Sequence, residues 1–583
     1  MSNRSTKLNK ISDFINNNST MVFCFACFLM ANGFLLSFVI PFNQPIAGHD
    51  YSYHYLRVDA LKYNIETGNM FSGIDYLYFG GGGYAGSAYP SLFLYIPALL
   101  RVMGMSIGSS MSVFILICNL LSYGFMYMFM RKISNSPVCG TIGAVLYVLS
   151  GYRLDNIIER FALGEVQAYV FWPLILYGLY DFIFCDFKKP YIIGIGIGGL
   201  MLCHTISTAL ALGYCVIISL IFIKRILKTP KKLITLGITA GCTVLVTAYY
   251  WMPLLELLSS CDMSVSISAY HTVDYVIPFT GLFKEIVHNG IAGMGFPIFL
   301  LCVPRMFLTS TSPITKKYLL DHETKRPKKI FVIADVSLIT GLVTAVFSTS
   351  LVPWSLLSKV LDFMQFPWRF FAPSSLFLII AGSIYLYYIG RYTKAAKTVM
   401  MVVTCVALLI AFNHTVVAGI AHANFREDDF YTGNASETYH IGAGEWLPRA
   451  ARSGGLDELR SLGNYVMLSN DRRVLCEREN GKLTFDLRGR PDITSAKLPF
   501  IWYKGYEGTD ENGKKLDVYM SEKGLAVVDL NGAEGLITVE YKISAIKIIS
   551  YILSAVSAIS LIIIGIIWRY RKRKPQKTLK SGG

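Results

Sequence analysis

Four clusters of charged and polar residues lie at the ends of apolar runs, where a membrane enzyme would hold a charged substrate. The first follows an uncharged apolar run at 20–41 and holds His49, Asp50, His54 and Arg57. Transfer of a sugar to a hydroxyl group needs a base or a cation near the acceptor, and an aspartate suits either role. Because ionisable residues at membrane depth are functional by default, we predict that Asp50 is catalytic and that its three neighbours bind substrate. A helix cap is the alternative role for Asp50.

Two arginines and two glutamates form the second cluster, at Arg153, Glu159, Arg160 and Glu165. A guanidinium group donates charge-assisted hydrogen bonds to a phosphate, so these residues are candidates for substrate binding. The alternative is a loop that Glu–Arg salt bridges hold together without any ligand.

The third and fourth clusters are smaller. His204 lies inside an otherwise apolar stretch, while Trp368 and Arg369 belong to an aromatic run at 366–370. A lone histidine of this kind more often packs between helices through hydrogen bonds. An arginine among aromatic residues can pair with a lipid-linked phosphate or anchor a helix at the membrane interface. We include all three residues as candidates for substrate binding.

Membrane-spanning helices are the elements that must position these clusters. Of the 583 residues, 53% are hydrophobic and 16% are charged, against about 25% charged in soluble globular proteins. The formal net charge of +16 comes from Lys/Arg clusters between apolar runs. This is the positive-inside pattern and not the basic face of a nucleic-acid-binding protein. We therefore predict a multi-pass protein of the bacterial plasma membrane with no nucleic-acid partner.

Apolar runs of sufficient length predict about 12–13 transmembrane helices, since a bilayer requires ~20 residues for each. The basic clusters place both termini in the cytoplasm and the four polar clusters on the outer face. No small-residue cleavage site follows the first run, which favours a retained helix over a removed signal peptide. Three full crossings within 90–150 would place the basic residues that follow on the outer side of the membrane. One of the three predicted helices should therefore dip into the membrane or lie in the interface. The predicted spans are 20–41, 90–104, 107–130, 137–150, 167–185, 191–204, 205–223, 233–256, 291–307, 330–350, 370–389, 396–419 and 546–568.

One region of the chain is long and polar. Turn-forming stretches alternate there with short β-branched or aromatic runs, such as 525–530 and 536–541, which is typical of strands joined by tight turns. We predict a small extracellular β-rich domain ahead of the last helix. The predicted domains are 1–419 (transmembrane, with a first outer loop at 42–89), 420–545 (β-rich) and 546–583 (last helix and basic cytoplasmic tail).

Several motifs are absent from the sequence. It holds no Walker A, GxSxG or HExxH pattern, so ATP-driven transport and zinc proteolysis lose support. The glycine run Gly80–Gly83 lacks the Lys-Ser/Thr that follows a phosphate loop, and we interpret it as a flexible surface loop. Asp335, a lone acid within a span, is expected to pair with a neighbouring lysine.

The four clusters, taken in order, resemble the YfhO-like bacterial membrane proteins and the related "6-pyruvoyl-tetrahydropterin synthase-related" membrane family. Both families resemble glycosyltransferase superfamily C (GT-C). The resemblance extends over nearly the whole chain, and it is the ordered set of motifs that is specific. The matching stretches are GHDYSYHYLRVDALKYNIETG, YFGGGGYAGSAYPSLFLYIPALL, YRLDNIIERFALGEVQAYVFWPLILYGLYDF, LCHTISTALALGY, MQFPWRFFAPSSLFLIIAG, LPFIWYKGYE and KGLAVVDL.

The resemblance implies a GT-C-like fold and a transferase that takes a sugar from a polyprenyl-phosphate donor on the outer face, with inversion. Asp50 would act as base or as ligand of a divalent metal, Mg or Mn. Arg160, Glu165 and Arg369 would lie near the donor. GT-C enzymes often carry an acidic pair in the first loop, whereas here Tyr51 follows Asp50. The second acid is therefore Asp59, Glu159 or Glu165, or there is none.

The predicted function is a membrane glycosyltransferase that modifies a cell-surface glycopolymer, such as a teichoic acid or a polysaccharide. A transporter or flippase for a lipid-linked saccharide is one alternative, and it predicts polar residues deep inside helices. A non-catalytic assembly protein of the cell envelope is the other, and it would make Asp50 dispensable.

Overall fold

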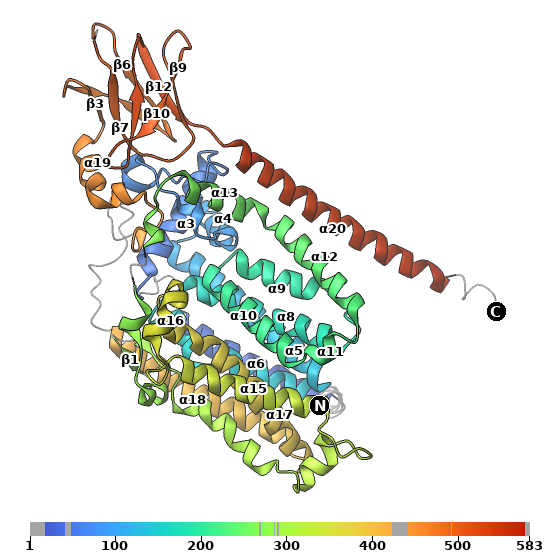
Figure 1. The fold of residues 1–583 in the computed structure, drawn as a ribbon. Helices are drawn as coiled ribbons and strands as arrows, with labels where there is room; N and C mark the ends of the chain where they lie inside the picture. The colour runs from blue at the N-terminus through green and yellow to red at the C-terminus, as the bar shows by residue number, and fades with distance from the viewer. Residues whose placement is uncertain are drawn as a thin grey trace, which may run out of the picture.

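The protein is a multi-pass α-helical membrane protein with a β-rich region ahead of its last apolar helix (Figure 1). Among the described residues, seven helices are long and apolar enough to cross a bilayer, and one bent pair of helices is a further candidate. A computed structural model describes residues 18–40, 48–267, 270–284, 286–288, 291–422, 441–490 and 492–577. The predictions made for the N-terminus, for 41–47, for 423–440 and for the end of the tail concern residues outside these ranges.

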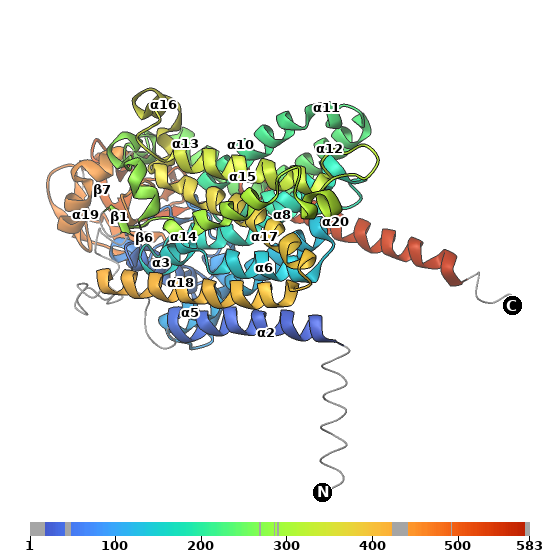
Figure 2. The same cartoon turned by 90° about the horizontal axis from the view of Figure 1, so that it is seen from below.

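Every predicted apolar range coincides with a helix or helix pair. The long helices are α2 (Ser19–Phe34), α5 (Ile107–Ser134), α8 (Leu163–Phe184), α15 (Lys329–Phe347), α17 (Phe371–Tyr392), α18 (Ala396–His422) and α20 (Ala545–Lys577). The shorter apolar helices are α4 (Tyr95–Val102), α6 (Pro137–Val148), α9 (Tyr191–Met201), α10 (Thr205–Ile221) and α14 (Phe296–Phe299) with its continuation η8 (Leu300–Phe307). Figure 2 shows α2 and α18 side by side along one face of the bundle.

Two of the predicted spans change in detail. The range 233–256 was expected as one helix, but it forms α12 (Pro230–Val246) and α13 (Ala248–Ser260), which meet at a bend of 66°. Within 90–150, α5 alone reaches spanning length among the described helices, because α4 has 8 residues and α6 has 12. Because α4 and α6 are too short to cross the membrane on their own, the three predicted helices of 90–150 need not make three crossings.

Helix α8 runs through the centre of the bundle, and nearly all of its residues are buried. It packs closely on α9 because glycines replace side chains at the crossing. A Cβ atom on Gly178 would lie 2.5 Å from Ile193 Cβ, and one on Gly196 would lie 2.9 Å from the backbone nitrogen of Ile175. Small residues at such crossings let two membrane helices approach each other.

We expect Gly178→Ala to destabilise the protein by about 1–3 kcal/mol, because the new methyl group overpacks the α8–α9 contact. Thermal unfolding of the purified protein in detergent measures this change. Gly213→Ala in α10 is the matched control, since a Cβ there meets no described atom within 4 Å. Equal midpoints for the two variants would contradict the close packing of α8 on α9.

The lone acid Asp335 pairs with an arginine, which corrects the expected lysine. Arg305 Nε and Nη2 donate to its two carboxylate oxygens at 2.7 and 3.1 Å, and the Tyr385 hydroxyl donates at 2.6 Å. A two-pronged arginine contact of this kind balances the carboxylate inside the bundle. Asp335 therefore joins η8, α15 and α17 and is not a candidate for catalysis.

The described part of the β-rich region contains two antiparallel five-stranded sheets. Their buried residues form one core, which confirms a β-rich region before the last helix and resolves it into a two-sheet packing. One sheet has the order β10 (Val518–Met520), β11 (Leu525–Asp529), β7 (Ser495–Ile501), β3 (Tyr465–Leu468), β4 (Arg473–Leu475). The other has the order β5 (Glu477–Glu479), β6 (Lys482–Asp486), β12 (Leu536–Tyr541), β8 (Tyr506–Thr509), β9 (Lys515–Leu516).

The first loop packs into this same core, although it is distant in sequence. Tyr78 and Tyr84 are fully buried there, and the Gly82 carbonyl accepts a hydrogen bond of 2.9 Å from Ile501 N. The run Gly80–Gly83 is therefore a packed turn on β7, which corrects its interpretation as a flexible surface loop. This contact places the end of the loop, and the cluster around Asp50, between the sheets and the helices.

Candidate functional site

The first and second clusters meet through the backbone. Asp50 directly precedes α3 (Tyr51–Glu66), and Glu159 and Arg160 of the second cluster directly follow α7 (Gly151–Ile158). His49 N donates to the carbonyl of Glu159 and Asp50 N to that of Arg160, each at 3.0 Å. Gly48 allows this approach, since a Cβ there would lie 2.8 Å from Phe161 Cβ. The short run Gly48-His49-Asp50 is thereby fixed against the segment that carries Arg160.

Two arginines share one buried glutamate at the centre of the site. Arg160 Nη1 donates to Glu165 Oε1 at 3.0 Å, and Arg369 Nε lies 3.3 Å from the same oxygen. Arg160 also contacts Asn156 and Tyr152, and the Tyr152 hydroxyl donates to Glu165 Oε2 at 2.9 Å. Arg160, Glu165 and Arg369 together carry one net positive charge, and the carboxylates of Asp50 and Asp155 also attract Arg160.

Two buried donor groups at the Arg369 end of this group have no hydrogen-bond acceptor among the described residues. Trp368 stacks on Phe366 at 4.6 Å and is 2% exposed. Among the described residues, neither Trp368 Nε1 nor Arg369 Nε finds a hydrogen-bond acceptor with suitable geometry. Buried donors without an acceptor are costly unless a ligand oxygen satisfies them, and a phosphate would do so.

Asp50 keeps solvent-accessible surface although protein surrounds it closely. Its side chain makes no capping hydrogen bond to the described helix α3, so the cap alternative does not account for its carboxylate. Removal from bulk water raises the pKa of Asp50 to about 6, against the opposing attraction of Arg160 and Arg369. A carboxylate with this pKa is a better proton acceptor near neutral pH than an ordinary aspartate.

This pKa predicts a pH profile. Only the ionised form of Asp50 accepts a proton, so we expect kcat/KM for sugar transfer to fall as the pH drops through about 6 and to level off above neutrality. The measurement is the initial rate between pH 4.5 and 8, with the monodispersity of the protein checked at each pH. A rate that stays constant down to pH 4.5 would contradict the raised pKa.

The other first-cluster residues hold the loop in place. Arg57 Nη2 donates to Pro90 O and to Ser91 Oγ, each at 2.8 Å, and its guanidinium carbon lies 4.4 Å from the centre of the Tyr89 ring. His54 Nδ1 lies 3.3 Å from Arg57 Nη1. Burial and this cation lower the pKa of His54, which keeps its ring neutral.

Two further candidates have partners outside the central group. His204 begins α10 as a cap, since its Nδ1 lies 3.3 Å from Ser207 N and 2.7 Å from Ser207 Oγ. The packing alternative explains these contacts. Arg153 donates to the Val148 carbonyl and lies over the Tyr169 ring, so the structure does not bring it to Asp50. His49 remains with the second cluster, 3.7 Å from Glu159.

A second acid near Asp50 was missed from the sequence. Glu445 and Glu165 are the two carboxylates whose negative charge raises the pKa of Asp50. Burial also raises the pKa of Glu445 itself. Asp59, one of the predicted second acids, pairs instead with Arg101 at 2.8 Å. Glu445 lies almost 400 residues after Asp50, beside a turn without any motif, so no spacing could indicate it.

The divalent metal at Asp50 stays a prediction. Mg²⁺ is usually held by one or two carboxylates together with substrate phosphates and water. The described part of the chain holds no group of three or more His, Cys, Asp or Glu residues that could bind a metal ion. Two arginines lie beside Asp50 instead. The predicted metal therefore gains no further ligands here, and no chemical step below passes through one.

An apolar groove of about 240 Å³ lies among α6, η8 and α18, and its lining does not include Arg160, Glu165 or Arg369. The lining includes Gly151, the neighbour of Tyr152 in sequence, and exposed apolar side chains such as Leu300, Val402 and Val406. These exposed side chains belong to η8 and α18, on the outside of the bundle. Gly151 of the lining directly precedes Tyr152, which hydrogen-bonds both Arg160 and Glu165.

Comparisons with known proteins are limited in extent. No family model matches the chain, so the YfhO-like resemblance stays a prediction. An uncharacterized protein of Lactococcus lactis subsp. cremoris (strain MG1363) is 27% identical over 233 residues, which cover 38% of each chain.

Two solved structures are similar in part. The archaeal oligosaccharyltransferase AglB from Archaeoglobus fulgidus, in complex with an inhibitory peptide and a dolichol-phosphate, has a TM-score of 0.36 and 10% identity over 75% of this chain and 61% of its own. The arabinofuranosyltransferase AftD from Mycobacteria has a TM-score of 0.35 and 14% identity over 72% of this chain and 27% of its own. The chain thus spans less than two thirds of each of these three proteins. Similarity at this level assigns no activity.

Proposed function

We propose that this chain is a membrane glycosyltransferase that moves a sugar from a polyprenyl-phosphate donor to a cell-surface glycopolymer. The observation that carries the proposal is the position of the accessible carboxylate of Asp50 beside the buried, net cationic group of Arg160, Glu165 and Arg369. The Asp50 carboxylate suits the acceptor hydroxyl, and the two arginines suit the leaving phosphate.

In the proposed reaction Asp50 takes the proton of the acceptor hydroxyl. The acceptor oxygen then bonds to the anomeric carbon, while the bond from that carbon to the phosphate oxygen breaks. The electron pair leaves with the phosphate, and Arg369 and Arg160 stabilise its growing negative charge. Attack opposite the leaving group inverts the anomeric centre. Tyr152 and Asn156 hold Arg160 in position for this role.

The apolar groove supplies a place for the polyprenyl tail of the donor. Its lining is mostly apolar and includes Gly151, which is next to Tyr152 in sequence. We propose that the tail lies in this groove with its phosphate toward Tyr152 and the arginines, so that burial of the chain in the membrane orients the reacting bond. The positive-inside pattern of the basic clusters supports a site on the outer face.

The first test is the glycan composition of the cell envelope in the host with and without the gene. We expect deletion to remove one sugar decoration and reintroduction of the wild-type gene to restore it. Transfer from a radiolabelled polyprenyl-monophosphate sugar in proteoliposomes then identifies the chemistry. An unchanged envelope after deletion would overturn the proposal. Loss of the decoration without any transfer in proteoliposomes would point to the flippase or assembly alternative.

A further inference from the structure

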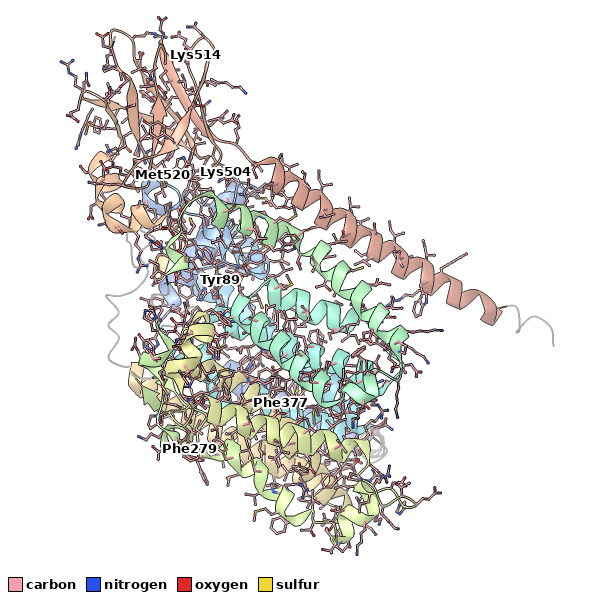
Figure 3. All side chains as sticks on the ribbon, viewed as in Figure 1. Tyr89, Phe279, Phe377, Lys504, Lys514 and Met520 are labelled. Carbon is pink, nitrogen blue, oxygen red and sulfur yellow. The ribbon has the colours of Figure 1, made fainter. Side chains whose placement is uncertain are left out.

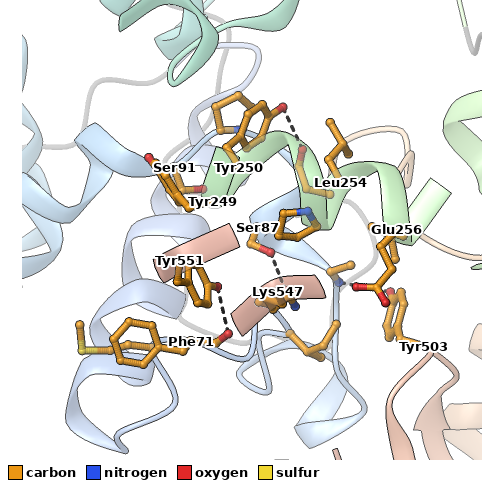
Figure 4. Close-up of a pocket in the computed structure, with 18 of the residues that line it drawn as sticks. Phe71, Ser87, Ser91, Tyr249, Tyr250, Leu254, Glu256, Tyr503, Lys547 and Tyr551 are labelled. Atoms are coloured by element: carbon orange, nitrogen blue, oxygen red, sulfur yellow. Dashed lines mark hydrogen bonds between the residues drawn. The ribbon is translucent and has the colours of Figure 1, made fainter. Parts of the chain in front are cut away.

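A second pocket, of about 390 Å³, lies between the first loop, α13, the first turns of α20 and the β-rich region (Figure 4). It is separate from the groove described above. Figure 3 labels Tyr89 between Lys504 of the β-rich region and Phe377 of the bundle, and Ala88 and Pro90 line the pocket on either side of it in sequence. A Cβ on Gly164 would lie 2.4 Å from the Tyr89 hydroxyl. Tyr89 thus separates this pocket from the start of α8.

Lys547 is the most unusual residue of this pocket, and it lies near the middle of the lining in Figure 4. It is 8% exposed, and its ammonium group donates to the Ser72 carbonyl and to the Tyr541 hydroxyl. Among the described residues it forms no ion pair within 4 Å, whereas the nearby Glu256 pairs with Lys504 at 3.3 Å. The carboxylates of Glu256 and Asp75 attract this ammonium group from beyond contact distance, so an anionic ligand would supply its contacting counter-ion among the described residues.

A membrane anchor is the simplest alternative role for Lys547. A lysine at the start of a spanning helix often extends its ammonium group to the water and headgroup region. Lys547 does the opposite, because its ammonium group is buried against the first loop. Its position two residues into α20 still places the pocket at the membrane boundary, where anionic headgroups lie.

The rest of the lining suits an amphiphile. Met70, Phe71 and Leu92 are 40, 57 and 41% exposed at the edge of the pocket, so apolar side chains flank its opening. The Tyr551 hydroxyl donates to the Phe71 carbonyl and so joins α20 to this edge. Aromatic rings and hydroxyl groups at one place match a ligand with a polar head and an apolar chain. Further walls are formed by Tyr95, Tyr249, Tyr250 and Tyr503.

We propose that this pocket binds the phosphate headgroup of an anionic membrane amphiphile, with Lys547 contacting the phosphate and the apolar edge contacting the first part of the acyl or isoprenyl chain. Lys504 also lines the pocket, where Glu256 of the same lining balances its charge at 3.3 Å. This binding does not depend on the proposed transfer reaction, since it is measured as ligand bound and not as sugar moved.

The test measures binding to the full-length protein in detergent by native mass spectrometry. The probes are phosphatidylglycerol, zwitterionic phosphatidylcholine and glycerol 3-phosphate, which is the headgroup without acyl chains. We expect phosphatidylglycerol to bind at least about tenfold more tightly than either of the others, as the loss of one charge-assisted contact or of the apolar chain predicts.

Two variants with matched controls locate the site. Leu254→Trp fills the pocket from α13, whereas Leu255→Trp adds the same ring at a neighbouring position that is 57% exposed and outside the lining. Lys547→Gln removes the buried charge, and Lys542→Gln removes an exposed one. We expect L254W and K547Q, but not L255W or K542Q, to weaken phosphatidylglycerol binding by about tenfold.

Three outcomes would overturn the proposal. Equal binding of phosphatidylcholine would remove the role of Lys547 in selecting an anion. Equal binding of glycerol 3-phosphate would assign the pocket to a water-soluble phosphate. Unchanged binding in L254W would place the lipid elsewhere, even if K547Q fails to fold.

Discussion

Asp50→Asn should reduce sugar transfer by about 10²–10⁴-fold, the usual contribution of a general base, while leaving the protein at least as stable as the wild type. Asparagine has nearly the same shape but cannot accept the proton. The wild-type carboxylate is held where its ionised form is disfavoured, which is why its pKa lies near 6. A neutral side chain removes this cost of folding at neutral pH. The Asp50 side chain makes no capping hydrogen bond to the described α3, so the substitution removes no helix contact.

The two readouts together separate the roles considered for Asp50. Transfer is measured in proteoliposomes and thermal unfolding in detergent, with Asp186→Asn as a control because Asp186 is exposed and pairs only with Lys188 at 2.9 Å among the described residues. Lost transfer at unchanged or higher stability supports the base. A lower unfolding midpoint would instead favour a structural role. Full transfer in D50N would show that Asp50 is dispensable, as the assembly alternative requires.

The helices could be predicted from the sequence because a bilayer demands long apolar runs, and each predicted run lies on a helix. The bend between α12 and α13 could not. A proline is the usual sign of a break, and Pro253 lies within α13. Yet Pro173 lies within α8 without ending it, so a proline alone does not locate a bend in this bundle.

The site was predictable where its contacts are local and hidden where they are long-range. Arg160 and Glu165 lie five residues apart and form the salt bridge that the alternative for the second cluster expected. Arg369 joins them from another helix through a contact that only the resemblance placed there. Glu445 approaches from the segment before the sheets, and nothing in its local sequence distinguishes it from a surface acid. Packing of the first loop into the β-rich core was hidden for the same reason.

Arg369→Gln should lower kcat/KM for the lipid-phosphate donor by about 10²–10³-fold, the usual cost of removing one group that stabilises charge in a transition state. The expected loss is larger for the donor, because Arg369 would contact the donor phosphate in the proposed reaction, although the substitution also removes one of the two cations that attract the Asp50 carboxylate. Glu165 keeps Arg160 and Tyr152 as partners in this variant. Removal of Arg160 would be less informative, since it would also break contacts with Tyr152 and Asn156.

The measurement varies the donor at saturating acceptor and then the acceptor at saturating donor. Arg391→Gln is the matched control, because Arg391 is exposed near the end of α17, the helix that follows Arg369, and lies over the Tyr318 ring. We expect R369Q to lose donor kcat/KM while its KM for the acceptor changes little, and R391Q to behave as wild type. Equal losses for donor and acceptor would refute the phosphate contact. They would instead indicate that Arg369 only balances Glu165, so that its removal loosens the whole junction of α7, α8 and α17.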